Sequence, residues 1–164
     1  MRLVVADTGP LNYLVLIGSV DLLPRLFEKV FTPVAVQAEL LDPDAPAAVR
    51  TWAAQPPPWL EISPVSAAID DPAWRALDAG ERAALALART LSAELVLMDD
   101  RAGVAVAQRL GFTVTGTLSV LDLAAQRGLL DLADAFARLR ATSFRYPPEV
   151  MDALLARHRK RDQE

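Results

Sequence analysis

The stretch ELVLMDDRAGVAVAQRLGF, residues 94–112, contains an apolar run, a pair of acids and a helical pattern. Residues 95–98 are typical of a buried strand, and residues 101–110 have the apolar periodicity of a helix. Asp99 and Asp100 lie at the joint between the two. One acid there is explained as a helix N-cap, whose side chain accepts hydrogen bonds from free backbone N–H groups. Two adjacent acids at the carboxyl end of a strand need a second explanation.

The same alternation of strand and helix extends along the rest of the chain. Apolar runs predict strands at residues 2–6, 29–33, 60–62, 95–98 and 112–116, the third of them at an edge of the sheet. Helical patterns span residues 10–17, 20–27, 33–41, 45–54, 78–92, 101–110, 117–127, 131–140 and 147–160. Strands separated by helices predict an α/β fold, with a parallel sheet of four to five strands flanked by helices on both faces.

Neither an internal repeat nor a composition shift divides the chain. We therefore expect residues 1–164 to form one domain, with residues 131–164 as a C-terminal helical extension. Thr32 and Thr117 precede helical patterns and are predicted to be N-caps.

The composition restricts the chemistry that this chain can perform. It has no cysteine and one histidine, so disulfides, thiolate metal sites and a histidine triad are excluded. No apolar run is long enough to span a membrane, and the run before Asp7 is too short for a signal peptide, which predicts a cytoplasmic protein. The net charge of −4 argues weakly against a nucleic-acid binder that works by bulk electrostatics. Residues 157–161 are a basic cluster, interpreted as a solvated helix end, and His158 within it as a surface residue, in preference to an RNA-contacting tail.

Three acids follow predicted strands directly. Asp7 ends the first strand, and Asp99 and Asp100 end a later one. In parallel sheets, ligands bind outside the carboxyl ends of the strands, so these three side chains should meet at one edge. Each acid taken singly is explained as an N-cap, but caps have no reason to converge on one crevice.

Two further acids have a local explanation as well as a functional one. Glu39 lies near the margin of the apolar face of a short helix, and taken alone it is best explained as a solvent-exposed residue. Glu81 stands three residues after Asp78, which is the spacing of a capping box. Spacing alone therefore favours capping over catalysis for Glu81.

Four stretches together resemble one protein family. They are VVADTGPLNYL at the start, VFTPVAVQAEL in the next third, LDAGERAALALA, and LVLMDDRAGVAVAQRLGFTVTGTLSVL. In order, spacing and character they resemble the PIN-domain family of metal-dependent ribonucleases, in particular its short prokaryotic branch related to toxins of toxin–antitoxin pairs. The resemblance covers roughly residues 1–130, and its first and last stretches are the most specific.

The resemblance implies a PIN-like sheet whose acids bind Mg²⁺ or Mn²⁺ and hydrolyse RNA phosphodiesters. Carboxylate oxygens suit such hard cations, and a bound cation would activate the attacking water. Asp7 and Asp100 are the expected direct ligands, with Asp99 as the alternative to Asp100. The full set of expected catalytic and metal-binding residues is Asp7, Glu39, Glu81, Asp99 and Asp100, with Glu39 and Glu81 acting through water.

The neighbours of these acids have expected roles too. Thr8 occupies the place of a hydroxyl residue that supports the family's site. Arg82 and Arg101 stand next to proposed acids and are candidates for contacts with RNA phosphates, against the simpler explanation of solvation or ion pairing.

Two other functions compete with the ribonuclease. Phosphoryl transfer through an aspartyl phosphate would need a DxD pair after the first strand and a well-placed lysine, which this chain lacks. A non-catalytic PIN-like module that binds nucleic acid or protein, with its acids serving as caps, stays open. The apolar content of residues 10–18 and of the late helices predicts a homodimer or a complex with a small antitoxin protein.

Overall fold

The computed structural model describes residues 2–65 and 72–163. Its sheet has five strands in the order β3-β2-β1-β4-β5, and every neighbouring pair is parallel. The strands are β1 (Leu3–Ala6), β2 (Lys29–Pro33), β3 (Leu60–Ser63), β4 (Leu95–Leu97) and β5 (Val114–Thr115). The predicted parallel α/β sheet is confirmed, and β3 lies at its edge as expected.

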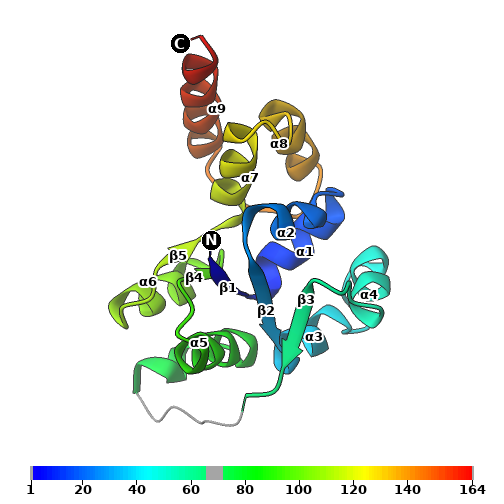
Figure 1. Cartoon of the computed structure of the whole chain (residues 1–164), viewed down its shortest axis with the longest axis vertical. Helices are drawn as coiled ribbons and strands as arrows, with labels where there is room; N and C mark the ends of the chain where they lie inside the picture. Colours follow the sequence, from blue (N-terminus) through cyan, green and yellow to red (C-terminus); the bar gives the residue numbers. More distant parts are fainter. Residues whose placement is uncertain (1, 66–71, 164) are drawn as a thin grey trace.

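Nine α-helices and two 3₁₀ helices connect and cover these strands within the described residues (Figure 1). They are α1 (Thr8–Leu16), η1 (Val20–Leu22), α2 (Leu23–Leu26), α3 (Val34–Leu40), α4 (Ala47–Ala54), η2 (Pro72–Ala76), α5 (Ala79–Leu91), α6 (Arg101–Arg109), α7 (Thr117–Gln126), α8 (Leu132–Arg140) and α9 (Pro148–Asp162). Within the described part of the chain, no helix is long and apolar enough to cross a membrane.

Side chains of the central strands alternate between two cores, one on each face of the sheet. Val4 and Ala6 of β1 lie in the first core with Leu97 of β4. Val5, which lies between Val4 and Ala6, and Val96, which directly precedes Leu97, lie in the second core on the opposite face of the sheet. Because both faces of these strands are covered by helices, the strands are apolar at every position rather than at every second one.

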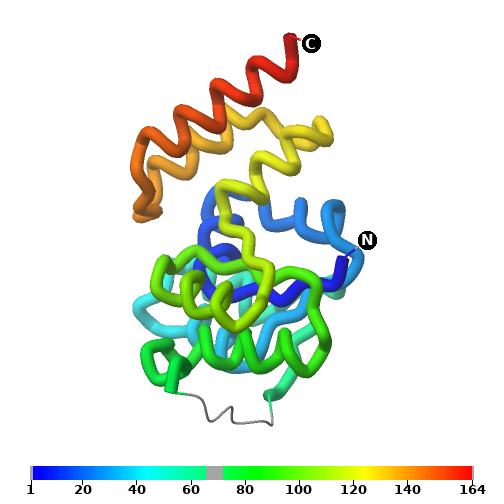
Figure 2. Tube along the Cα trace, turned by 90° about the vertical axis from the view of Figure 1, so that its left-hand side faces the viewer, coloured from blue at the N-terminus to red at the C-terminus, as the bar shows by residue number. Residues whose placement is uncertain are grey.

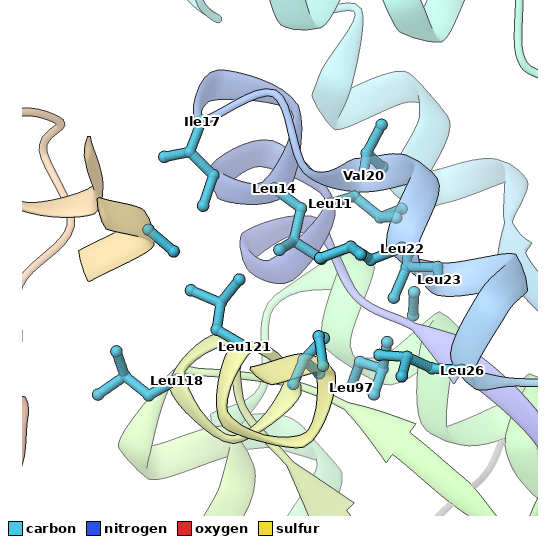
Figure 3. Close-up of a cluster of buried hydrophobic side chains, with 14 of the residues drawn as sticks. Leu11, Leu14, Ile17, Val20, Leu22, Leu23, Leu26, Leu97, Leu118 and Leu121 are labelled. Atoms are coloured by element: carbon cyan, nitrogen blue, oxygen red, sulfur yellow. The ribbon is translucent and has the colours of Figure 1, made fainter. Parts of the chain in front are cut away.

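The first core joins α1 and α7 to the sheet. Leu11 and Leu14 of α1 approach Leu121 of α7 and Leu97 of β4 (Figure 3). These leucines are fully buried. Part of the apolar surplus inferred for residues 10–18 is therefore inside the molecule, whereas Val15 and Leu16 of the same helix are only half-buried. The homodimer itself stays a prediction.

The two last helices lie together at one end of the long axis, where they pack on α7 (Figures 1 and 2). Asp122 of α7 is only 5% exposed and ties α9 to this end of the molecule. Its carboxylate oxygens lie 2.7 Å from Arg161 and 3.4 Å from Arg157, and Gln126 donates a hydrogen bond of 2.9 Å. These ion pairs span 35 and 39 residues, so they fix tertiary structure rather than a local turn.

The basic cluster at residues 157–161 is therefore only partly a solvated helix end. Arg157 and Arg161 bind Asp122. The His158 side chain is 17% exposed, with Nε2 3.4 Å from Asp162 and a buried Nδ1 that has no hydrogen-bond partner. The interpretation of His158 as a freely solvated residue was wrong, because α9 turns that side chain inward.

Both predicted threonine caps were also wrong. Thr32 is the fourth residue of β2, and its hydroxyl donates a 2.8 Å hydrogen bond to the Ala6 carbonyl of the neighbouring strand. Thr117 is the first residue of α7, with Gly116 at the N-cap position. In each case the hydroxyl bonds to another element rather than to its own helix.

Candidate functional site

The strand order of the sheet reverses between β1 and β4. β1 connects onward to β2 on one side, and its other neighbour is β4. Asp7 directly follows β1, and its backbone N–H donates a 2.9 Å hydrogen bond to the Leu97 carbonyl of β4. Asp99 and Asp100 follow β4, so the topology brings all three acids to the carboxyl edge of the two central strands, as predicted. Such a reversal point is where open α/β sheets bind ligands.

Asp7 is buried without the hydrogen bonds that a cap would make. It occupies the N-cap position of α1, yet its side chain makes no capping hydrogen bond. The residue is 6% exposed, and Oδ1 has no hydrogen-bond partner. The pKa of Asp7 is raised to about 7, mainly by burial. A hydrogen bond from the Thr8 backbone N–H lowers this pKa, and the negative charges of Asp78, Glu39 and Asp99 raise it further. The simple explanation of Asp7 as a helix cap therefore fails.

The Glu39 side chain is bonded within the protein, to Thr8 and Gly80, instead of pointing into solvent. It is half-buried on α3, and its two carboxylate oxygens accept hydrogen bonds from the Thr8 hydroxyl and, at 3.0 Å, from the Gly80 backbone N–H. A Cβ at position 80 would come within 2.5 Å of the Glu39 carboxylate, so glycine leaves it room. Expecting a solvent-exposed Glu39 was wrong, and Thr8 supports this acid across 31 residues of sequence.

Glu81 makes only half of the predicted capping box. The Asp78 side chain accepts a 2.8 Å hydrogen bond from the Glu81 N–H, which caps α5. Within the described residues no reciprocal bond joins the Glu81 carboxylate to the Asp78 N–H. Glu81 is 7% exposed, and its pKa is raised to about 8, mainly by burial. A side-chain hydrogen bond with Asp78 and the negative charges of Asp78, Asp100 and Asp7 raise this pKa further.

Asp78 is the acid that sequence reasoning did not assign to the site. It was expected only as the first residue of the capping box, and it does cap α5. It also acts electrostatically on both Asp7 and Glu81. The capping spacing accounted for Asp78 completely, so no sequence signal remained to indicate this second role.

The side chains of the two acids after β4 bind the N-termini of two different helices. Asp100 is the N-cap of α6, with Oδ1 accepting a 2.9 Å hydrogen bond from the Gly103 N–H. Asp99 accepts a 2.8 Å bond from the Thr117 N–H and a 2.5 Å bond from its hydroxyl, at the start of α7. Burial raises the pKa of Asp99, and these two bonds lower it. Both Asp99 oxygens are thereby engaged, whereas one Asp100 oxygen is not used by the cap.

Two glycines make room for these carboxylates. A Cβ at Gly103 would collide with the Glu81 carboxylate, and one at Gly116 would lie 2.7 Å from Asp99 Oδ1. Both contacts are far shorter than ordinary van der Waals distances. The acids therefore occupy the space that side chains at these two positions would need.

The arginines beside the acids face solvent. Arg82 and Arg101 are exposed, and neither forms an ion pair within the part of the chain that the structure describes. Of the two simpler explanations given for these arginines, solvation is what the structure shows, and ion pairing with the acids is absent in the described ranges. Both side chains are left able to contact an incoming anion.

The donor set at this edge suits a hard cation, although the side chains are not gathered around one point. Only carboxylates and hydroxyls are present there, which are the oxygen ligands that Mg²⁺ and Mn²⁺ prefer. One Asp7 oxygen has no hydrogen-bond partner, and the pKa values of Asp7 and Glu81 are raised, so a proton or a cation rather than a basic side chain would neutralise these carboxylates. Among residues 2–65 and 72–163, no three acids or histidines are arranged to hold one metal ion. A cation would therefore require side chains to rotate towards Asp7.

Comparison with models of protein families identifies the family of this chain. The model of a family described as a PIN domain matches residues 3–160, which is nearly the whole chain. No curated protein matches the sequence significantly.

Proposed function

Because the chain belongs to the PIN-domain family, we propose that it is a metal-dependent endoribonuclease that hydrolyses RNA phosphodiesters at the carboxyl edge of its sheet. The observation that carries this proposal is Asp7: its carboxylate is 6% exposed, has an unpartnered oxygen and is affected by the charges of three other acids. Burying an unpaired charge costs several kcal/mol unless a proton or a cation neutralises it. The unpartnered Asp7 carboxylate therefore favours the binding of a cation at this position.

Asp7, Asp100 and Glu81 are the residues that would hold Mg²⁺ or Mn²⁺. Each has at least one carboxylate oxygen outside the backbone hydrogen bonds of the site. Asp99 and Glu39 are better suited to positioning, because both oxygens of each already accept hydrogen bonds. When bound, the cation would lower the pKa of a coordinated water and offset negative charge on the scissile phosphate.

The chain's own residues would release a proton and bind the substrate. Burial raises the pKa of Glu81 to about 8 in the metal-free protein, so Glu81 would give up a proton when it binds the cation. Arg82 and Arg101 are exposed beside the acids and would hold flanking phosphates against their repulsion.

A second candidate is the non-catalytic PIN-like module that binds nucleic acid or protein. The observation that favours it is that Asp78, Asp99 and Asp100 all bond to helix N-termini, and that no three of the described acids surround one point. This alternative leaves the unpartnered oxygen of Asp7 without a role. Metal dependence separates the two candidates.

The test is cleavage of a labelled single-stranded RNA by the purified protein. We expect cleavage with millimolar Mn²⁺ or Mg²⁺, its loss on chelation, and a higher melting temperature with the metal. Glu81→Gln keeps the hydrogen bond that the backbone N–H of residue 81 donates to Asp78, so the variant should retain the fold. Because the substitution removes the negative charge of the side chain, the variant should lose most cleavage and most metal-induced stabilisation. Asp134→Asn, in an exposed ion pair on α8, is the matched control that should cleave normally. Cleavage that survives exhaustive chelation would rule out this mechanism.

We further propose a toxin role, with a small antitoxin protein as partner, and a homodimer. The resemblance to the toxin-related branch supports this part. Induction of the chain in cells should arrest growth, and the Asp7→Asn chain should not. Light scattering that shows a monomer at high concentration, with no co-purifying protein, would contradict both assemblies.

A further inference from the structure

A cavity of about 610 Å³ opens beside the acids, between the start of α6 and the connection from α8 to α9. It is lined by Asp99, Asp100, Arg101, Arg145, Tyr146 and Pro147. A second cavity of about 210 Å³ shares Asp99, Arg101 and Tyr146 in its lining. The two hollows thus place an aromatic ring and two arginines next to the proposed catalytic edge.

Tyr146 is the outermost ring of an aromatic stack. Its ring lies parallel to that of Phe144, with 5.7 Å between centroids and 3° between planes. Phe144 in turn meets Tyr13 of α1 edge-on, at 5.0 Å and 79°. Tyr146 is 40% exposed, whereas Tyr13 and Phe144 are half-buried. Packing on one side therefore fixes the orientation of a ring that remains open to the cavity.

Arg101 and Arg145 carry the positive charge of this cavity. Both are exposed, and neither forms an ion pair with any residue in the described ranges. They line the cavity together with two carboxylates. Guanidinium groups bind phosphate oxygens through paired N–H donors, which favours a ligand with a phosphate at this place.

We propose that Tyr146, Arg101 and Arg145 form a nucleotide subsite in which an unpaired RNA base stacks on Tyr146 and the adjoining phosphates contact the arginines. This inference rests on the proposed ribonuclease function, and it names the substrate class as single-stranded RNA. A base within a duplex is already stacked on its neighbours, so only an unpaired base can stack on the exposed face of the Tyr146 ring. Stacking on an aromatic side chain contributes about 1–3 kcal/mol for each base.

Binding of a labelled oligoribonucleotide, followed by fluorescence anisotropy, tests the subsite separately from catalysis. The full-length Asp7→Asn protein serves as the background, so that the RNA is not cut. Adding Tyr146→Ala should weaken binding about tenfold or more, while Tyr146→Phe, which keeps the ring, should bind as the background does. A strand of equal length with abasic positions should bind both proteins equally. Tyr146→Leu repeats the test with apolar bulk retained, and circular dichroism establishes that each variant is folded.

The arginines have a distinct signature in the same experiment. Arg101→Ala and Arg145→Ala should weaken the binding of base-bearing and abasic strands alike. Each should also reduce the slope of log affinity against log salt concentration by about 0.7 for every phosphate that is no longer neutralised. Arg109→Ala, at the opposite end of α6, is the matched control.

Two results would overturn the subsite even if the native protein cleaves RNA. One is unchanged affinity of the Tyr146→Ala protein, and the other is an equal fall in affinity for base-bearing and abasic strands. If the stacking pattern holds and no cleavage occurs with any metal, the proposed function fails and the subsite stands.

Discussion

Asp7 and Asp122 are buried to nearly the same extent, but their carboxylates differ in the hydrogen bonds and ion pairs that they form. Asp122, at the interface of α7 and α9, accepts bonds from two arginines and a glutamine. Asp7, at the edge of the sheet, has an oxygen without any partner, and its pKa is raised to about 7. A buried charge that serves the fold is neutralised from within the chain. A buried charge left unneutralised is stabilised only by something from outside, which is why Asp7 indicates function and Asp122 does not.

The largest expected effect is on cleavage. Asp7→Asn removes a proposed direct ligand and should lower kcat about a thousand-fold, because metal-ion catalysis supplies several kcal/mol. Asp122→Asn should leave kcat within about threefold, because its carboxylate bonds only to α7 and α9 residues. Single-turnover cleavage at saturating metal measures both. A comparable loss in the two variants would remove the contrast between the carboxylates.

The second effect is the dependence of stability on pH without metal. The folded-state pKa values of Asp7 and Glu81, about 7 and about 8, lie above their ordinary values of 3.8 and 4.5. The folded state therefore holds protons that the unfolded chain has lost, and the free energy of unfolding should fall from about pH 4 to pH 8. For Asp7 alone the fall is at most about 4 kcal/mol.

Urea denaturation across this pH range, compared with the Asp7→Asn/Glu81→Gln double variant, isolates that dependence. The wild type should lose stability relative to the double variant as the pH rises. Cations compete with the retained protons, so stabilisation by Mn²⁺ should be larger at pH 8 than at pH 6. A wild-type curve parallel to that of the double variant would contradict the raised pKa values.

The third effect is the contribution of Asp122 to stability. Asp122→Asn should lower the free energy of unfolding by about 1–2 kcal/mol, since charge-assisted bonds to a buried acid are removed while the arginines remain accessible to water. Asp134→Asn breaks the exposed pair with Arg138 and should cost less than about 0.5 kcal/mol. Urea titrations of both variants give the comparison, and equal losses would show that Asp122 is no more important than a surface acid.

The smallest effect concerns the room that glycine leaves for Glu81. Replacing a helical glycine by alanine normally stabilises a protein by up to about 1 kcal/mol. Gly103→Ala should bring no such gain, because the new Cβ meets the Glu81 carboxylate. In a Glu81→Ala background part of the gain should reappear, although the Met98 sulfur would still lie 3.0 Å from the new Cβ, and a double-mutant cycle measures this directly. Additive effects would show that the carboxylate moves aside without cost.

The sheet could be predicted from sequence because its signals are local. The apolar run 95–98 and the pattern of residues 29–33 each predicted a strand to within a residue. Asp7 and Asp99 could be placed at the same edge because parallel strands end on the same side. The topology therefore followed from short-range patterns and one general rule.

The hydrogen-bond partners could not be predicted, because they join residues far apart in sequence. Thr8 bonds to Glu39 and Asp99 to Thr117, across 31 and 18 residues. No spacing rule connects such pairs, so local reasoning alone explained Glu39 as a solvent-exposed residue and Thr117 as a cap, and only the family resemblance assigned Glu39 to the site. Asp122 was overlooked although it is a single acid in the apolar segment TLSVLDLAAQ, and an acid in such a segment indicates a buried partner.

The order of the strands determines when this site can form as the chain is synthesised. β1 lies between β2, which follows soon after it, and β4, which is made about ninety residues later. Asp99 is held in place only once Thr117 has emerged as well. At about 5–20 residues per second, the interval from Asp7 to Thr117 lasts several seconds or more. A ribosome-bound chain therefore carries an incomplete set of these acids and their partners for most of its synthesis.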